Sequence, residues 1–258
     1  MKGLGIFIHS VKQVFGNFGA AIRISAVLYL VQIGVALALG QSLTSADASQ
    51  YAEMAQTGNF PVVQLLVTLI IALVTSLWIA VAWHRYVLLN EEPGSVVPAF
   101  RGDRILGYFG YSILIALIMV VLGAIIGMVA GLVLGPLLLS NGPTLVGLLL
   151  IGLVVYVPLL VIGYRLSVAL PASALGAPLG LGGAWERTKG ATGTLLVLGV
   201  ISVVAAFLLD APATYVFVPG SVPAIIWSAL TQWVFVMVGV SILTTLYGHY
   251  VEDRALNA

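Results

Sequence analysis

The run from Ser112 to Leu134, SILIALIMVVLGAIIGMVAGLVL, decides the fold class of this chain because it contains no charged residue. Its 23 residues, at about 1.5 Å of helix rise each, reach about 35 Å and so cross a bilayer core of about 30 Å with some tilt. Glycines recur here at every fourth position, at Gly123, Gly127 and Gly131 and, just beyond the run, at Gly135. A helix places them in one stripe, where the backbone of another helix can approach closely. We expect this glycine stripe to pack against another helix of the chain; a pore lining and an oligomer seam are the alternatives.

The composition of the chain is that of a membrane protein. Of its 258 residues, 61% are hydrophobic and 7% are charged, whereas soluble domains carry about 25% charged residues. The net charge of +1 gives no basic excess that would attract a nucleic-acid partner. The sequence contains no cysteine, and its three histidines lie far apart, so it shows no metal-ligand spacing. We expect one integral membrane domain over residues 1–258, without a cofactor.

Six long apolar runs predict an all-α, polytopic membrane bundle with amphipathic segments at the interface. The predicted spans are 20–40, 61–83, 108–134, 144–164, 192–209 and 225–247. Residues 5–18 place apolar side chains at helical spacing, which indicates an amphipathic helix on the membrane surface. Pro158 should kink the fourth span. Because residues 166–181 include Pro171 and Pro178, we expect an interfacial or re-entrant segment there and no further span.

The distribution of charge predicts how the six spans are oriented. All ten basic residues then fall near the termini or in the connections after the second and fourth spans. The opposite side carries Asp47, Glu53 and Asp210 and no basic residue. The positive-inside rule therefore predicts that both termini lie in the cytoplasm. A repeat of three helical hairpins of about 85 residues each is a further hypothesis.

Cationic side chains at predicted helix ends are the candidates for a binding site: Arg165, His84 and Arg85. A guanidinium holds a phosphate or carboxylate in a bidentate fork, so Arg165, after the kinked span, predicts an anion or lipid head-group site. The alternatives are that Arg165 snorkels to the interface and that His84 and Arg85 form a satisfied pair at a helix end. The neighbouring carboxylates of Glu91 and Glu92 should diverge and be solvated.

A second stripe of small side chains lies in the predicted span 61–83. Ala72, Ser76 and Ala80 recur at four-residue spacing. Small residues let helix backbones approach in a membrane, so these three positions are predicted packing residues and the expected mate of the glycine stripe.

Several short motifs resemble a known family. They are TSADASQYAEMAQTGN at 44–59, Val157-Pro158, Arg165 followed by LSVALPA, AWERTKG at 184–190, and an aromatic-rich end of the last predicted span. With these motifs the chain resembles the YciC-like bacterial membrane proteins, which are akin to the membrane domain of some glycerophosphodiester phosphodiesterases. The resemblance implies a six-helix protein of the bacterial inner membrane without an established activity. It does not extend to the soluble phosphodiesterase domain, so no catalysis is carried over.

Two classes of function are consistent with the sequence. The first is a structural or accessory protein that binds membrane lipids, another membrane protein or a second copy of itself. The second is a transporter or channel for a small solute, which usually has ionisable groups near the bilayer midplane. The middle of each predicted span is nearly free of charge, with Gln32 and Gln232 as the most polar exceptions, and this favours the first class. No nucleophile–base pair or metal set can be assembled from the sequence, so we do not expect an enzyme.

Overall fold

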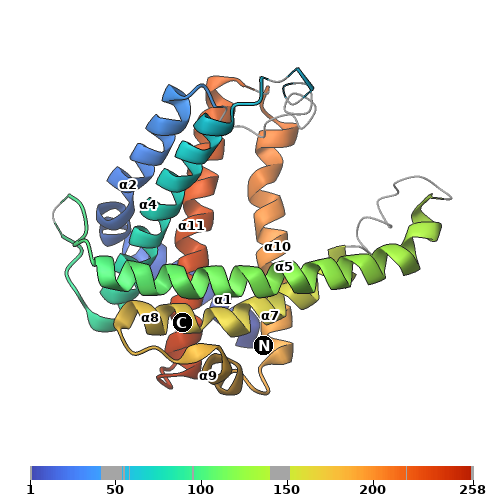
Figure 1. The fold of residues 1–258 in the computed structure, drawn as a ribbon. Coiled ribbons are helices and arrows are strands. Elements are labelled where there is room, and N and C mark those ends of the chain that lie inside the picture. Colours follow the sequence, from blue (N-terminus) through green and yellow to red (C-terminus); the bar gives the residue numbers. More distant parts are fainter. Residues whose placement is uncertain are drawn as a thin grey trace. The chain divides into compact units, whose positions relative to one another are not determined.

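The computed structural model describes residues 2–41, 54, 56–57, 59–94, 96–139, 152–218 and 220–256. All regular structure in these ranges is helical (Figure 1). The elements are α1 (Lys2–Gly16), α2 (Phe18–Ala38), α4 (Val62–Leu89), α5 (Gly102–Leu139), the π-helical turn η1 (Gly152–Tyr156), α7 (Val157–Ser167), α8 (Ala169–Leu175), α9 (Gly180–Arg187), α10 (Thr192–Tyr215) and α11 (Val222–Tyr250). The all-α prediction is confirmed.

Six helical stretches of the described chain are long and apolar enough to cross a membrane, so this is a multi-pass membrane protein. They are Phe18–Ala38, Val62–Leu89, Gly102–Pro136, Val154–Leu175, Thr192–Ala213 and Val222–Tyr250. The predicted number of spans is confirmed. Most of the stretches extend beyond their predicted ends, because the last turns of a helix remain helical after the apolar run stops. The predicted start of the fourth span, at residue 144, lies outside the described residues.

The segment expected to be interfacial or re-entrant is instead mostly part of the fourth span. Between α7 and α8, Val168 keeps helical dihedrals of φ −61° and ψ −21°, so the helix continues with only a slight break. Pro171 lies in the first turn of α8, where a missing backbone N–H costs little. The helix ends only at Gly176, which has φ +84°, before Pro178 is reached. The prediction was therefore wrong for residues 166–175, because it treated each proline as a break regardless of its place in a helix.

The contacts of the described chain divide it into two compact units. Unit 1 comprises Met1–Ser10, Gly102–Val203 and Ile242–Ala258, and unit 2 comprises Val11–Arg101 and Val204–Ser241. Helices α1, α10 and α11 contribute residues to both units. The single domain expected from the sequence stays a prediction.

In unit 1, helices approach closely at two glycines outside the predicted stripe. A Cβ atom built at Gly3 would lie 2.5 Å from the carbonyl oxygen of Thr194, so α1 touches the backbone of α10 there. A Cβ atom at Gly107 would lie 2.9 Å from Oγ of Ser173, so α5 passes close to α8. Two turns further along α1, the hydroxyl of Ser10 donates to the carbonyl oxygen of Ile6 over 2.8 Å and lies 3.0 Å from the hydroxyl oxygen of Thr245 on α11. These contacts fix α1, α5 and α8 within the unit.

The described residues do not pack closely against the predicted glycine stripe of α5. A Cβ atom at Gly127, Gly131 or Gly135 would meet no described atom within 4 Å, and one at Gly123 would lie 3.7 Å from Leu159. Close packing of the whole stripe against the described part of the chain is therefore not observed. Large apolar side chains of the same stretch are exposed, among them Leu132 at 74%.

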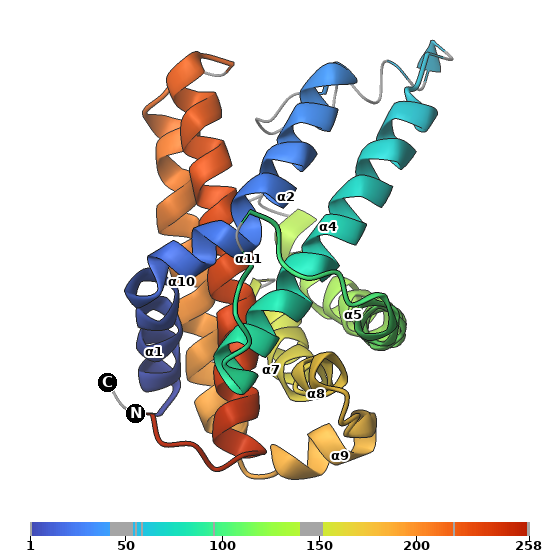
Figure 2. The same ribbon diagram turned by 90° about the vertical axis from the view of Figure 1, so that its left-hand side faces the viewer.

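In unit 2, α2 packs beside α4, as Figure 2 shows. The side-chain amide of Gln32 on α2 donates to Oγ1 of Thr75 over 2.6 Å and to Oγ of Ser76 over 3.2 Å. Ala80, one turn further along, is buried. In the small-residue stripe of Ala72, Ser76 and Ala80, Ser76 is thus contacted by α2. The sequence predicts instead that this stripe packs against the glycine stripe of α5. The same contacts satisfy the amide of Gln32 inside an apolar span.

Candidate functional site

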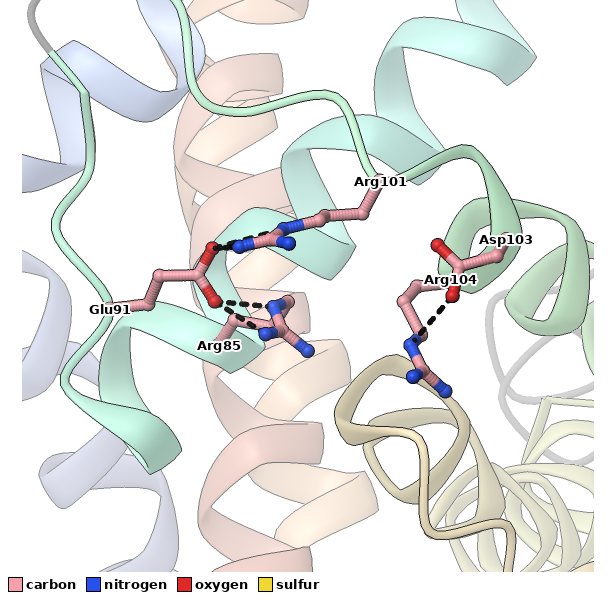
Figure 3. A network of polar contacts seen from close by, with 5 residues as sticks. All are labelled: Arg85, Glu91, Arg101, Asp103 and Arg104. Carbon is pink, nitrogen blue, oxygen red and sulfur yellow. Dashed lines mark hydrogen bonds and ion pairs between the residues drawn. The ribbon is translucent and has the colours of Figure 1, made fainter.

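The end of α4 carries an ion-pair cluster, defined by Arg85, Glu91 and Arg101, that lies wholly within unit 2. Asn90 ends the helix in the left-handed region, with φ +54°, and this turn brings Glu91 back towards Arg85. Nε of Arg85 donates to Oε2 of Glu91 over 2.6 Å, and Nη2 of Arg101 donates to Oε1 over 2.8 Å. Figure 3 shows the guanidinium groups of Arg85 and Arg101 both directed at the carboxylate of Glu91. The cluster ties the segment after α4 to the last turn of that helix.

The electrostatics of the cluster favour an ionised Glu91. Burial raises the pKa of this carboxyl, but hydrogen bonds from Arg101 and Arg85, with the attraction of their charges, outweigh burial and hold the net pKa below its ordinary value. Glu91 was expected to be solvated, and the structure shows instead a carboxylate with a cation at each oxygen. Arg85, a predicted anion-binding residue, therefore has a protein carboxylate as its anion.

A polar cavity of about 380 Å³ opens beside the cluster, also wholly within unit 2. It is lined by Gln13, Asn17, Tyr86, Val87, Asn90, Glu91 and Glu92. The hydroxyl of Tyr86 donates to Oδ1 of Asn17 over 3.1 Å, and Nδ2 of Asn17 donates to the carbonyl oxygen of Gln13 over 2.8 Å. These two bonds fix which atom of the Asn17 amide is the acceptor. Convergent polar groups around a cavity of this size are what a small-ligand site requires, so this polar cavity is the candidate site.

The three predicted head-group residues do not form one site within a unit. His84 and Arg85 belong to unit 2, and Arg165 belongs to unit 1. His84 of α4 is fully buried, while Arg85 pairs with Glu91. Neither side chain is therefore placed to bind a lipid phosphate directly.

Arg165 is buried, with 6% of its surface exposed. Its Nη1 donates to the carbonyl oxygen of Thr188 over 2.9 Å, and its Nη2 donates to Oγ1 of Thr192 over 2.5 Å. Its Cζ lies 4.9 Å from the ring centroid of Trp185, within the range of a cation–π contact. The guanidinium therefore joins α7 to α9 and to the start of α10. Its role in holding an external anion stays a prediction, and the partners observed are protein groups.

Two further features of unit 1 were not found from the sequence. The guanidinium of Arg104, paired with Asp103 over 3.0 Å (Figure 3), occupies the space where a side chain at Gly176 would stand, beside the end of α8. A second cavity, of about 280 Å³, is mostly apolar and includes Met119, Leu160 and Leu243 in its lining. Both depend on contacts between residues far apart in the chain, which leave no local signal.

Among the described residues, no cluster of acidic or histidine side chains is arranged to hold a metal ion. Comparisons with family models, with curated proteins and with solved structures find no match to this chain. The polar cavity and the helices around it are therefore the features of this chain that bear on its function.

Proposed function

We propose that this chain is a non-enzymatic, accessory protein of the bacterial inner membrane that binds membrane lipid and another membrane protein or a second copy of itself. We also propose that it belongs with the YciC-like proteins that its motifs resemble, with both termini in the cytoplasm. The one-sided distribution of Lys and Arg supports that orientation.

The polar cavity at the end of α4 is the observation that carries the lipid-binding role. Its lining residues come from the junction of α1 with α2 and from the end of α4, which are the ends of two candidate spans. The ends of spanning helices lie at the depth of the lipid head groups. A polar cavity at that depth is reached by head groups from the bilayer, whereas a transport site is usually near the midplane.

The glycine stripe of α5 supports binding of a protein partner. Three of its four glycines have no described atom within reach of an added Cβ, and the neighbouring apolar side chains are exposed. A helix face with small residues packs favourably against another membrane helix, because the two backbones can approach closely. A partner helix on this face is therefore the second half of the proposal.

Purification in a mild detergent, followed by native mass spectrometry, tests both halves. We expect near-stoichiometric lipid in the wild-type protein, together with a protein partner or a dimer that Gly131→Leu removes and Ile126→Leu retains. Reconstitution in vesicles with solute-uptake assays tests the alternative of a transporter. Protein that carries neither lipid nor partner, or that mediates uptake, would contradict the accessory role.

A further inference from the structure

The polar cavity at the end of α4 has walls rich in hydrogen-bond acceptors. The carboxylates of Glu91 and Glu92, the side-chain oxygens of Asn17 and Asn90, and the phenol oxygen of Tyr86 all belong to residues that line it. No Lys, Arg or His is among the lining residues. The ligand that complements such walls is one that brings N–H or O–H donors and positive charge.

The two carboxylates at the cavity differ in how far their charge is already balanced. Both oxygens of Glu91 accept from guanidinium groups, one from Arg85 and one from Arg101. Glu92 is exposed, and no hydrogen bond or ion pair joins its carboxylate to any described residue. The cavity therefore has one carboxylate whose charge is neutralised by the protein and one that is available to a cation.

We propose that this cavity binds a protonated primary amine, with Glu92 as its counter-ion and the oxygens of Asn17 and Tyr86 as acceptors for its N–H groups. An ammonium group brings three donors, which match the acceptors from α1, α4 and the segment after α4. A trimethylammonium group has no N–H donor and relies on a cage of aromatic rings. Only Tyr86 among the lining residues is aromatic, so the cavity should prefer ethanolamine to choline.

The depth of the cavity in the membrane determines which amines can reach it. Beside Asn17, the rings of Phe15 and Phe18 are stacked with centroids 6.5 Å apart, and about half the surface of each residue is exposed. Asn17 and Asn90, which line the cavity, flank the ends of the candidate spans α2 and α4. The ends of spanning helices lie at the membrane–water interface, so we place the cavity at head-group depth. Phosphatidylethanolamine and a free primary amine from the aqueous phase both carry the required group.

The selectivity is tested with full-length protein in nanodiscs of phosphatidylcholine that contain increasing fractions of phosphatidylethanolamine. Native mass spectrometry after release from the disc reports which lipid is retained. Titration calorimetry with ethanolamine and with choline reports binding of the free amines. The variants are Glu92→Gln, which keeps the shape and removes the charge, and Asn17→Leu, which removes the acceptor. Glu186→Gln is the matched control, because Glu186 is an exposed carboxylate outside the cavity.

We expect phosphatidylethanolamine to be retained over phosphatidylcholine, and Glu92→Gln to weaken that preference about fivefold, as loss of a partly solvated ion pair does. Glu186→Gln should bind as the wild type does. Retention of the lipid without binding of free ethanolamine identifies the lipid as the source; binding of free ethanolamine that displaces no lipid identifies the aqueous amine.

Two outcomes would overturn the inference. The first is equal retention of both lipids together with equal binding of both free amines. The second is a lipid preference that is unchanged in both Glu92→Gln and Asn17→Leu. In its lipid arm the inference rests on the proposed function, and the outcomes of the two tests are separable. Lipid retained without head-group preference leaves the accessory role standing and removes the amine site. Ethanolamine bound by protein that retains neither lipid nor partner removes the accessory role and leaves the amine site.

Discussion

Replacing Gly3 with alanine should push α1 away from α10 inside unit 1. The added Cβ would lie 2.5 Å from the carbonyl oxygen of Thr194 and 2.9 Å from the amide nitrogen of Leu198. Ordinary contact begins near 3.4 Å, so the backbones must separate by about 0.9 Å, and no side-chain rotation relieves a clash with backbone atoms. Overpacking of this kind lowers the free energy of unfolding by about 1–3 kcal/mol.

Gly127→Ala is the matched control for this prediction. Its Cβ would meet no described atom within 4 Å, and alanine favours a helix over glycine by up to about 1 kcal/mol, so the variant should be as stable as the wild type or more stable. Reversible unfolding by SDS in mixed micelles, with any purification tag at the C-terminus, measures both free energies. Equal stability of Gly3→Ala and the wild type, or an equal loss in Gly127→Ala, would refute the reasoning.

Three further predictions concern charge and topology. The pKa of Glu91 is lowered in the folded protein, so its contribution to stability is complete above the unfolded pKa of about 4.3 and is lost as the pH falls towards the folded pKa. Glu91→Gln should therefore flatten the dependence of unfolding free energy on pH below about pH 5. An unchanged dependence would contradict the ion-pair cluster. Arg165→Lys should lose one of the two bonds to Thr188 and Thr192 and lower the SDS midpoint despite its retained charge, whereas a snorkelling arginine would tolerate lysine. In intact cells an impermeant thiol reagent should label Ser221→Cys and spare Ala255→Cys; the reverse pattern would invert the proposed orientation.

The contacts of Arg165 show which properties of a candidate residue the sequence predicts and which it does not. The sequence predicts an external anion for Arg165, or snorkelling to the interface, and both stay predictions. It did not predict the protein partners Thr188 and Thr192, because they lie more than twenty residues along the chain, after the turn that ends α8 at Gly176. Only the path of α8 and α9 brings their oxygens to the fork.

The candidate site followed the same pattern. Its lining residues come from α1, from the end of α4 and from the segment after it, and none of them forms a motif at a fixed spacing. The closest signal in the sequence is the pair of adjacent carboxylates, Glu91 and Glu92, for which the sequence predicts solvated side chains. The left-handed turn at Asn90 separates their roles, since it directs Glu91 to Arg85 and leaves Glu92 at the cavity.

The sequence by itself determined that this chain is all-α and has six spans, because a predominantly apolar run about as long as the bilayer core is thick is a local property that no tertiary contact reverses. Tertiary structure decided which small residues pack. Gly3 and Gly107 contact other helices, whereas Gly127 and Gly131 meet no described atom, although periodicity favours the latter pair. The physical reason is that spacing sets which side chains share a face of a helix, while the neighbours of that face depend on how the other helices are placed.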